Sequence, residues 1–377
     1  MLKILHLSHD GLPDWRIEKS AMTAVKNGHK VFFAGGRQRE GYESSTFSKT
    51  LEVDWMVGPK IDQVSFAMLG IPFFWDMVKK QVGRAIEEVR PDIIHAHNIY
   101  SARMALEFKL AFVYDDHEYW SKHIALIRMR RGSSSSIKNL IKKLGRYYVG
   151  RLWPAWEREI VTSAPVITVS DTIINDYKEM YDSQRLFLVP NYPILHEIEK
   201  FPRPRLNSEL TSVYAGADDL GKVTPHRNIQ GFPELFEEND IGKLVMIGPN
   251  GQSSLKVRYT GFVKREKMYL EMGNGSIGLL PWQSHWFHKY SNPNKAYEYA
   301  HAGLFVMCTS SFEAVANALE ENCITFDDYS SLVSQLNAMK SDMDGLYNKR
   351  LKIFEFARSK LVWENNEKNI LAAYQAC

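Results

Sequence analysis

Residues 290–303, YSNPNKAYEYAHAG, gather polar and charged side chains around the start of a predicted helix. Ser291 or Asn292 can cap that helix, and the fixed φ of Pro293 suits its first turn. A helix N-terminus presents free backbone N–H groups and the positive end of the helix dipole, which together attract phosphate. Lys295 adds a full positive charge at the same end. The segment therefore predicts an anion-binding site.

Glu298 follows Lys295 by three residues, so both side chains can project from one face of the helix. A diphosphate at the lysine and a ribose diol at the glutamate would match this separation. The alternative is an ordinary capped helix in which the two side chains form an intrahelical ion pair worth about 0.2–0.5 kcal/mol.

A second polar cluster, YDDHE at 114–118, ends an apolar run. A single histidine after a strand is most often a structural residue, but the carboxylates around His117 favour a functional site. Asp115, Asp116 and Glu118 also raise the question of a metal site. We expect none, because contiguous ligands are not spaced to converge on one ion, and these carboxylates can orient His117 or cap the next helix.

Short apolar runs recur along the first half of the chain with helical patterns between them, at 2–8, 30–36, 91–98, 111–118, 165–171 and 186–193. The runs are continuous rather than alternating, as in strands that crossover helices bury on both faces. They therefore predict a parallel sheet. Most end in polar or small residues, where parallel sheets bind their ligands.

The same rhythm restarts after a stretch rich in proline and charge, 191–209, which we interpret as a linker. The later runs lie at 210–216, 243–250, 275–282, 304–310 and 323–328. Helices are expected at roughly 345–360 and 363–376, the second with a stripe formed by Trp363, Ile370, Leu371 and Tyr374. The expected fold class is α/β, with two Rossmann-like doubly wound domains that face each other across a cleft.

Several segments resemble family 4 glycosyltransferases, retaining enzymes of the GT-B fold. PNKxxEYxxAG after a GLLPW strand resembles the nucleotide-binding segment of that family, and YDDHE resembles its YDxHE segment. DWRIEKSAMTAVKNGHKV (14–31) resembles the first helix and the following strand, while VRYTGFVKREKMYLEM (257–272) resembles the strand and helix before the nucleotide site. The resemblance spans most of the chain.

The resemblance implies a division into domains. An acceptor-binding domain would occupy 1–195 and a nucleotide-sugar-binding domain 210–360, with a hinge near 195–209. A last helix, 361–377, would cross back to the first domain.

The resemblance also implies roles for individual residues. Glu298 would accept hydrogen bonds from the nucleotide ribose, while Lys295 and Arg227 would bind the donor diphosphate as charge grows on the leaving group. Arg227 lies in HRNIQGFPELF (226–236), where the family often has an arginine that opens a helix. Lys222 competes for this role, but Arg227 offers a bidentate fork.

His117 matches the family histidine that contacts the donor sugar near the reacting centre. Further donor contacts are assigned to Asn292, to Asn294 and to Gly11, the only glycine in a loop where many relatives have a pair. The common family form has two glutamates separated by seven residues. Tyr290 stands at the first of these positions, which marks the sequence as the PNK variant.

A basic segment runs from Lys122 to Arg151, with nine Lys or Arg residues and no Asp or Glu. Apolar and aromatic residues interleave in IKNLIKKLGRYYVGRLW (137–153), as in a helix on an anionic membrane, where each basic residue adds about 1 kcal/mol. The alternative is a solvated helix with its apolar face in the core; RNA binding lacks any recognisable module. The predicted membrane or acceptor surface comprises Arg130, Arg131, Lys138, Lys142, Lys143 and Arg146.

Composition limits the partners and the compartment. The chain has 377 residues, enough for two domains, and its net charge of +3 is too small to imply nucleic acid. Three cysteines without a CxxC motif fit a reducing cytosol. No apolar stretch approaches the ~20 residues of a membrane span. We expect a cytoplasmic protein, peripheral on the inner face of the cell membrane if the basic segment binds lipid.

The predicted activity is transfer of a hexose from a nucleoside diphosphate sugar to a hydroxyl of a glycan, lipid-linked or protein-linked acceptor, with retention and without a metal or other cofactor. Two alternatives share the fold: a nucleotide-sugar epimerase that needs no acceptor, and a non-catalytic nucleotide- or sugar-binding scaffold. The one GxGxxG stretch, GNGSIG at 273–278, runs into a predicted strand instead of following one, and no P-loop motif occurs, which argues against a dehydrogenase or a P-loop NTPase.

Overall fold

The computed structural model describes residues 1–55, 69, 71–129, 137–216 and 225–377. The chain divides into two compact units by its internal contacts. The first contains residues 1–190 and 366–377, and the second contains residues 191–365.

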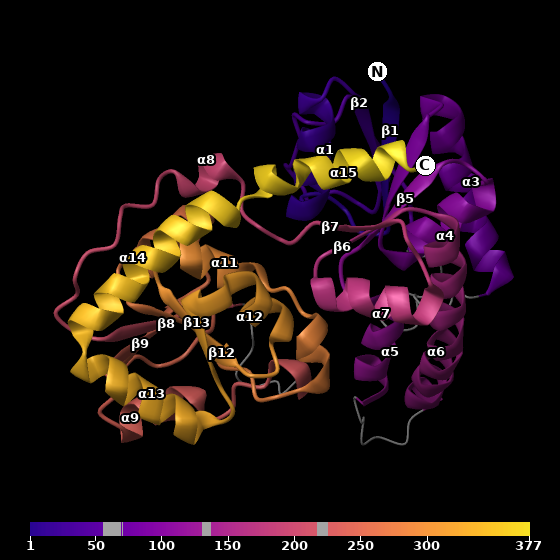
Figure 1. Cartoon of the computed structure of the whole chain (residues 1–377). Coiled ribbons are helices and arrows are strands. Elements are labelled where there is room, and N and C mark those ends of the chain that lie inside the picture. Colours follow the sequence, from indigo (N-terminus) through magenta and orange to yellow (C-terminus); the bar gives the residue numbers. More distant parts are fainter. Residues whose placement is uncertain (56–68, 70, 130–136, 217–224) are drawn as a thin grey trace. The chain divides into compact units, whose positions relative to one another are not determined.

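The first unit is built on a seven-stranded sheet with the order β3-β2-β1-β4-β5-β6-β7 (Figure 1). Every neighbouring pair is parallel, which confirms the predicted sheet type. The strands are β1 (Lys3–Ser8), β2 (Lys30–Gly35), β3 (Thr50–Glu52), β4 (Ile93–His97), β5 (Phe112–Asp116), β6 (Val166–Thr168) and β7 (Leu186–Leu188). Among these strands only β3 has no counterpart among the predicted runs, because its sequence, Thr-Leu-Glu, contains a single apolar side chain.

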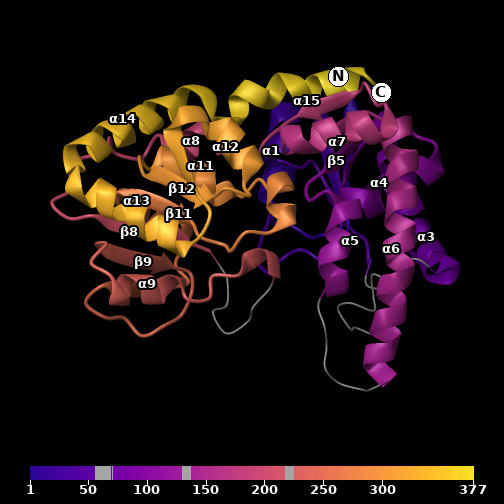
Figure 2. The same ribbon diagram turned by 60° about the horizontal axis from the view of Figure 1, so that its bottom comes forward.

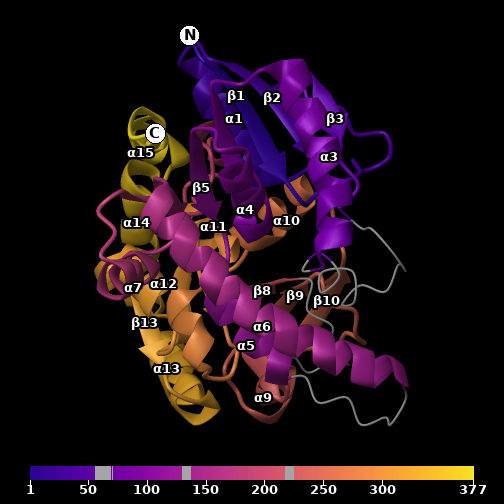
Figure 3. The ribbon, with the colours of Figure 1, turned by 90° about the vertical axis from the view of Figure 1, so that its right-hand side faces the viewer.

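Helices cover this sheet. They are α1 (Trp15–Lys26), α3 (Pro72–Val89), α4 (Asn98–Phe108), α5 (Trp120–Met129), α6 (Ile137–Ser163), α7 (Asp171–Tyr181) and α15 (Glu367–Gln375). The carboxylate of Asp14 caps α1 by accepting from the backbone N–H groups of Arg16 and Ile17. Helices α5 and α6 lie side by side (Figures 2 and 3).

The last helix of the chain, α15, packs in the first unit. It contacts α1 and lies along β5, β6 and β7. Ile370, Ala373 and Tyr374 form its buried face, and Lys26 of α1 pairs with Glu367 at 2.7 Å. The first unit is therefore completed by residues from both ends of the sequence.

The second unit is built on a six-stranded parallel sheet with the order β10-β9-β8-β11-β12-β13, the doubly wound order of dinucleotide-binding folds. Its strands are β8 (Thr211–Ala215), β9 (Lys243–Ile247), β10 (Val257–Gly261), β11 (Ile277–Leu280), β12 (Phe305–Thr309) and β13 (Cys323–Phe326). Its α-helices are α8 (Leu195–Ile198), α9 (Phe232–Glu238), α10 (Arg265–Gly273), α11 (Asn294–His301), α12 (Glu313–Leu319), α13 (Tyr329–Ser341) and α14 (Met343–Lys360).

The proline-rich stretch 191–209 belongs to the second unit. Tyr192, Ile198 and Phe201 are buried in its hydrophobic core. The division of the described chain thus falls at Pro190 and Asn191, before this stretch begins.

The helix predicted over 363–376 is wrong at its start. Trp363 lies in a separate 3₁₀ turn, η4 (Trp363–Asn366), and α15 begins only at Glu367. The backbone N–H of Trp363 donates to the carbonyl of Pro193 at 2.9 Å, and the residue as a whole is 1% exposed. Trp363 therefore packs in the second unit, and only the rest of the predicted stripe belongs to α15.

The structure does not test the predicted membrane or acceptor surface of the basic segment. Arg130 and Arg131 lie outside the described residues, while Lys138, Lys142, Lys143 and Arg146 belong to α6 at positions whose side chains are not described. Within the described ranges, no helix combines the length and the apolar character that crossing a membrane requires.

Candidate active site

Four buried polar side chains lie on one face of the first sheet, toward the carboxyl ends of β1, β4 and β5. His6 is the register partner of His95, and His97 is the register partner of Asp115. Register partners share a face of the sheet, and so do residues two apart in a strand. The four side chains are 0–1% exposed, and His117 follows directly after β5 with a side chain that is 12% exposed.

The histidines form a stacked, hydrogen-bonded group. The ring of His95 stacks on His6 and His97, with centroids 4.7 and 4.4 Å away. Nδ1 of His6 lies 3.0 Å from Nε2 of His97, whose Nδ1 lies 3.1 Å from Nε2 of His117. A line of imidazoles thus leads from the buried sheet to the partly exposed His117.

Asp115 is the charged centre of this group. Nε and Nη2 of Arg16 donate to its Oδ1 at 3.0 and 2.7 Å, and Nη1 donates to the carbonyl of Val189 at 2.8 Å. Burial alone would raise the pKa of Asp115, but the charges of Arg16 and His117 and its hydrogen bonds hold that pKa well below the ordinary value. The carboxylate is therefore ionised inside the unit.

The ionised carboxylate acts on the surrounding histidines. Burial alone would lower the pKa of His117, but Asp115, 3.6 Å away, raises that pKa above its ordinary value. Both ring nitrogens of His95 have hydrogen-bond partners. Nε2 lies 3.2 Å from Oδ2 of Asp115, and Nδ1 lies 2.7 Å from the hydroxyl of Tyr374. A side chain of α15 thus contacts the centre of the group.

The other carboxylates of YDDHE have different partners. Asp116 accepts from the hydroxyls of Tyr114 and Tyr177 at 2.9 and 2.6 Å, and burial raises its pKa to about 6. Glu118 pairs with His123 at 3.2 Å. The contiguous carboxylates therefore do not converge on one point.

The predicted phosphate site begins at α11 in the second unit, and its cap differs from the expectation. The N-cap is Pro293, with no side-chain cap hydrogen bond, so neither Ser291 nor Asn292 caps the helix. Oδ1 of Asn292 instead accepts from the backbone of Asn191 at 3.1 Å, and its Nδ2 donates to the hydroxyl of Tyr297 at 2.7 Å. Because both ends of this amide have protein partners, Asn292 is held as a buried structural residue.

Lys295 lies against two aromatic rings. Its Nζ is 4.3 Å from the ring centroid of Tyr214 and 4.6 Å from that of Trp282. The guanidinium carbon of Arg227 is 5.6 Å from the same Trp282 ring. The structure thus gathers two of the predicted diphosphate-binding cations around one indole, although Trp282 and Tyr214 themselves were not predicted as site residues.

The resemblance implied that Arg227 opens an α-helix, but it does not. It ends a 3₁₀ turn, η1 (Pro225–Arg227), and α9 begins five residues later at Phe232. The side chain is exposed. Its rival for the same role, Lys222, lies outside the described residues.

Glu298 is a nearly buried carboxylate with a charged partner. Its side chain is 8% exposed, and Oε1 lies 2.9 Å from Nη2 of Arg265 in α10. Nε of Arg265 also lies 3.0 Å from Glu197. Asn294, the first residue of α11, is exposed at the same end of the helix as Lys295.

Gly11 has a steric reason to be glycine. A Cβ atom at this position would lie 1.9 Å from the carbonyl oxygen of Arg37. The loop after β1 therefore approaches residues 36–37 more closely than any other amino acid would permit.

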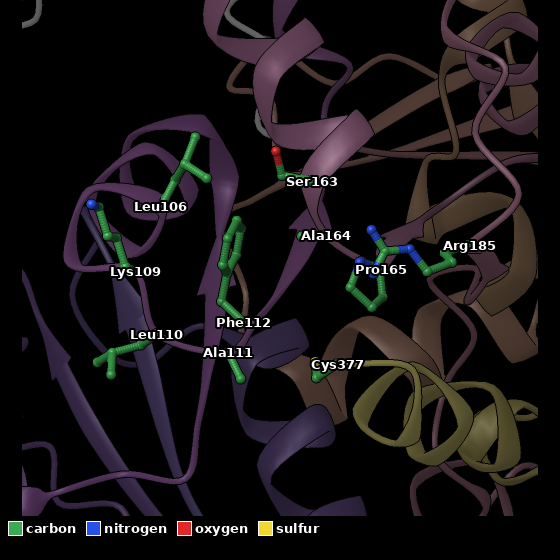
Figure 4. A pocket seen from close by; sticks show the side chains of 10 residues that line it. All are labelled: Leu106, Lys109, Leu110, Ala111, Phe112, Ser163, Ala164, Pro165, Arg185 and Cys377. Carbon is green, nitrogen blue, oxygen red and sulfur yellow. The ribbon is translucent and has the colours of Figure 1, made fainter.

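A surface pocket of about 300 Å³ lies elsewhere in the first unit (Figure 4). Its lining includes Phe112, Pro165 and Arg185, which stand at the beginnings of β5, β6 and β7. The histidine group lies toward the carboxyl ends of its strands. This pocket therefore lies at the amino ends of the strands, and His117 lies at their carboxyl ends.

No protein-family model matches the sequence, and no curated protein matches it either. Solved structures do match along the whole chain. Sucrose-phosphate synthase from Thermosynechococcus elongatus superposes with a TM-score of 0.70 at 13% identity, over 100% of this chain and 98% of that one. The chain therefore has the GT-B fold that these comparisons and its two doubly wound sheets define.

Two further solved structures show the same fold. HepE from Anabaena, in complex with UDP-glucose, superposes with a TM-score of 0.68 at 12% identity over the full length of both chains. CalG4, the calicheamicin glycosyltransferase, does so with a TM-score of 0.57 at 12% identity over 99% of this chain and 98% of that one.

Proposed function

We propose that this protein is a retaining, family 4-like glycosyltransferase that moves a hexose from a nucleoside diphosphate sugar to a hydroxyl of a glycan, lipid-linked or protein-linked acceptor. The observation that carries the proposal is that Lys295 and Arg227 both lie over the ring of Trp282. Lys295 is in the first turn of α11, and Glu298 follows about one turn later in the same helix.

Charge supports the donor assignment. A departing nucleoside diphosphate gains negative charge as the sugar leaves, and fixed cations stabilise that charge in the transition state. Lys295 and Arg227 supply two positive charges in the second unit, and Glu298 supplies acceptor oxygens for a ribose diol. We propose that these residues do the work a divalent ion does in other transferases, so that no metal is required.

His117 is proposed to contact the donor sugar. The raised pKa of this histidine, maintained against burial by Asp115, keeps a proton on the imidazole over a wider pH range. An imidazolium can donate a hydrogen bond to a sugar hydroxyl or to the leaving oxygen. The first unit is proposed to bind the acceptor.

The donor test uses the purified full chain. UDP, GDP and ADP sugars are screened by thermal shift, and the strongest stabiliser is then incubated with candidate acceptors while free nucleoside diphosphate is measured. UDP-glucose is a sensible first probe because HepE binds it. We expect a nucleotide-dependent rise in the unfolding temperature and acceptor-dependent release of diphosphate.

A double variant, Lys295→Ala with Glu298→Ala, tests the site itself. Transfer and nucleotide-dependent stabilisation should both fall to background. Lys289→Ala is the matched control, since this lysine lies over Tyr290 in the preceding 3₁₀ turn. Transfer at the wild-type level in the double variant would show that the donor site lies elsewhere.

The two alternative activities give different products. An epimerase would isomerise its nucleotide sugar without an acceptor, which chromatography of the sugar detects. A non-catalytic scaffold would bind the nucleotide sugar, and neither the sugar nor the diphosphate would change over time.

The basic segment remains a proposed membrane or acceptor surface, and the protein a proposed cytoplasmic or peripheral one. Co-sedimentation with anionic and with neutral vesicles tests this. Binding should require anionic lipid and should be lost on charge reversal at Lys142, Lys143 and Arg146. Equal binding to both vesicles, or none, would remove the proposal.

A further inference from the structure

We propose that His97, Asp115 and His117 form a binding site for a first-row divalent cation of the Zn²⁺ class, and that the bound cation inhibits sugar transfer. The binding is independent of the function proposed above, whereas the inhibition rests on the assignment of His117 to the donor sugar.

The three ligand atoms have the spacing that such a cation requires. Nδ1 of His97 and Nε2 of His117 are 3.1 Å apart, and each lies 3.6 Å from Oδ2 of Asp115. A point equidistant from the three atoms lies about 2.0 Å from each, and Zn–N and Zn–O bonds measure about 2.0–2.2 Å. The cation would fit with little movement of the side chains.

Neighbouring groups already orient the ligands. Nε2 of His97 lies 3.0 Å from Nδ1 of His6, so a proton on that Nε2 can be donated to His6 and leaves Nδ1 of His97 free to coordinate. Arg16 engages mainly Oδ1 of Asp115, at 3.0 and 2.7 Å. Oδ2 has longer contacts, 3.2 Å from Nε of Arg16 and 3.2 Å from Nε2 of His95, and a carboxylate oxygen that accepts from two donors can still bind a cation.

Exposure gives the site an entrance. His97 and Asp115 are 0–1% exposed, while the side chain of His117 is 12% exposed. A cation can therefore enter on the His117 side and keep its fourth position for water, as three-ligand zinc sites do. Two imidazoles and one carboxylate suit Zn²⁺ or Co²⁺, whereas Mg²⁺ and Ca²⁺ prefer sites built from oxygen.

We expect the bound cation to inhibit sugar transfer because it would coordinate Nε2 of His117. Coordination through Nε2 of His117 removes the nitrogen that faces Asp115 and His97, and fixes the ring over a bound ion. A histidine held in this way keeps its Nε2 on the cation and cannot swing out to offer that nitrogen to a donor sugar. We therefore expect Zn²⁺ to lower the transfer rate and a chelator to restore it.

The binding test uses untagged full-length protein that has been stripped of metal and titrated with Zn²⁺ against a chromophoric chelator. We expect one tight equivalent, at least 100-fold weaker binding in His97→Gln, and no competition from a thousandfold excess of Mg²⁺. Co²⁺ should give the visible absorption of a four-coordinate site with nitrogen and oxygen ligands.

A matched control separates this site from adventitious binding. His285→Gln removes a partly exposed histidine of the second unit and should leave the titration unchanged. His117→Gln guards against misfolding of the His97 variant, because its side chain is less buried. Unchanged stoichiometry and affinity in both the His97 and His117 variants, or loss of the tight equivalent in His285→Gln, would overturn the site.

The inhibition test compares each protein with its own zinc-free rate. Zn²⁺ at one equivalent above the enzyme should reduce wild-type transfer at least tenfold, reversibly with a chelator, and should leave the residual rate of His97→Gln unaffected. Tight one-to-one binding without any loss of transfer would overturn the inhibition and leave the site standing. Absence of transfer in every sample would fail the proposed function, whereas the titration would still decide the metal site.

Discussion

Nη2 of Arg265 lies 2.9 Å from Oε1 of Glu298, so the carboxylate assigned to the donor ribose already has a charged partner within the second unit. The arginine side chain is 43% exposed and the glutamate only 8%. A carboxylate offers about four acceptor directions. The arginine contact therefore helps to fix the orientation of the carboxylate that we assign to the ribose.

We predict that Arg265→Ala weakens binding of the nucleoside diphosphate about 3- to 10-fold, because the carboxylate loses the partner that fixes its orientation. The cost stays near 1 kcal/mol, since the arginine is half exposed. Calorimetric titration measures it. Arg258→Ala is the control, as it removes a comparable half-exposed pair, with Glu271, from the same unit; equal losses in the two variants would contradict the orienting role.

We predict that Lys295→Met lowers nucleoside diphosphate affinity at least tenfold without unfolding the protein. Methionine keeps an unbranched chain against Tyr214 and Trp282 while it removes the charge. The thermal midpoint of the free protein should stay within about 2 °C, and the nucleotide-dependent shift should vanish. A retained shift would mean that Lys295 serves the aromatic packing and not the diphosphate.

We predict that Arg16→Met destabilises the first unit by about 3–5 kcal/mol, since it leaves Asp115 charged and buried without its guanidinium. Denaturant unfolding of the full chain, followed by a probe in the first unit, measures the loss. Adding Asp115→Asn to this variant should recover part of it. If the double variant loses as much unfolding free energy as Arg16→Met and Asp115→Asn lose in sum, the unpaired charge of Asp115 is not the cause of the destabilisation.

Glu157 gives the stability of the protein a pH dependence. Oε1 accepts from the hydroxyl of Tyr181 at 2.9 Å and Oε2 from the backbone of Ser121 at 3.1 Å. Burial raises the pKa of this carboxyl to about 7, helped by the charge of Asp116. The folded state therefore favours the protonated form.

The sign follows from linkage. Because the folded pKa exceeds the unfolded value, the stabilisation is fully present below about pH 4.5 and is lost as the pH rises through about 7. The difference corresponds to roughly 3 kcal/mol. We predict that Glu157→Gln flattens the fall in unfolding free energy between pH 5 and 8. Parallel curves for wild type and variant would exclude Glu157 as the cause.

The sequence predicted the sheets better than it predicted the site. Continuous apolar runs mark buried parallel strands, and every predicted run contains a strand in the structure. The three histidines of β1 and β4 carried a signal too, since HAH at 95–97 places two imidazoles on one face. That His6 lies beside His95 and His97 depends on the pairing of β1 with β4, and the spacing of apolar residues does not reveal which strands pair.

Side-chain partners were the least predictable part of the second unit. Lys295 and Glu298 of the PNKxxE segment do lie in one helix, α11, yet nothing in that segment indicated Arg265 of α10 as the partner of Glu298. The capping prediction failed for a related reason. Asn292 is a good cap by type, but its amide is engaged by the backbone of Asn191 and the hydroxyl of Tyr297 instead.

The contact between Tyr374 and His95 has a consequence for biosynthesis. Residues 1–190 leave the ribosome well before residues 366–377, with the whole second unit made in the interval. Until then, the faces of β5, β6 and β7 that α15 covers stay open, and Nδ1 of His95 has no phenol beside it. The first unit to be synthesised is thus the last to be finished, and its final packing waits for the end of translation.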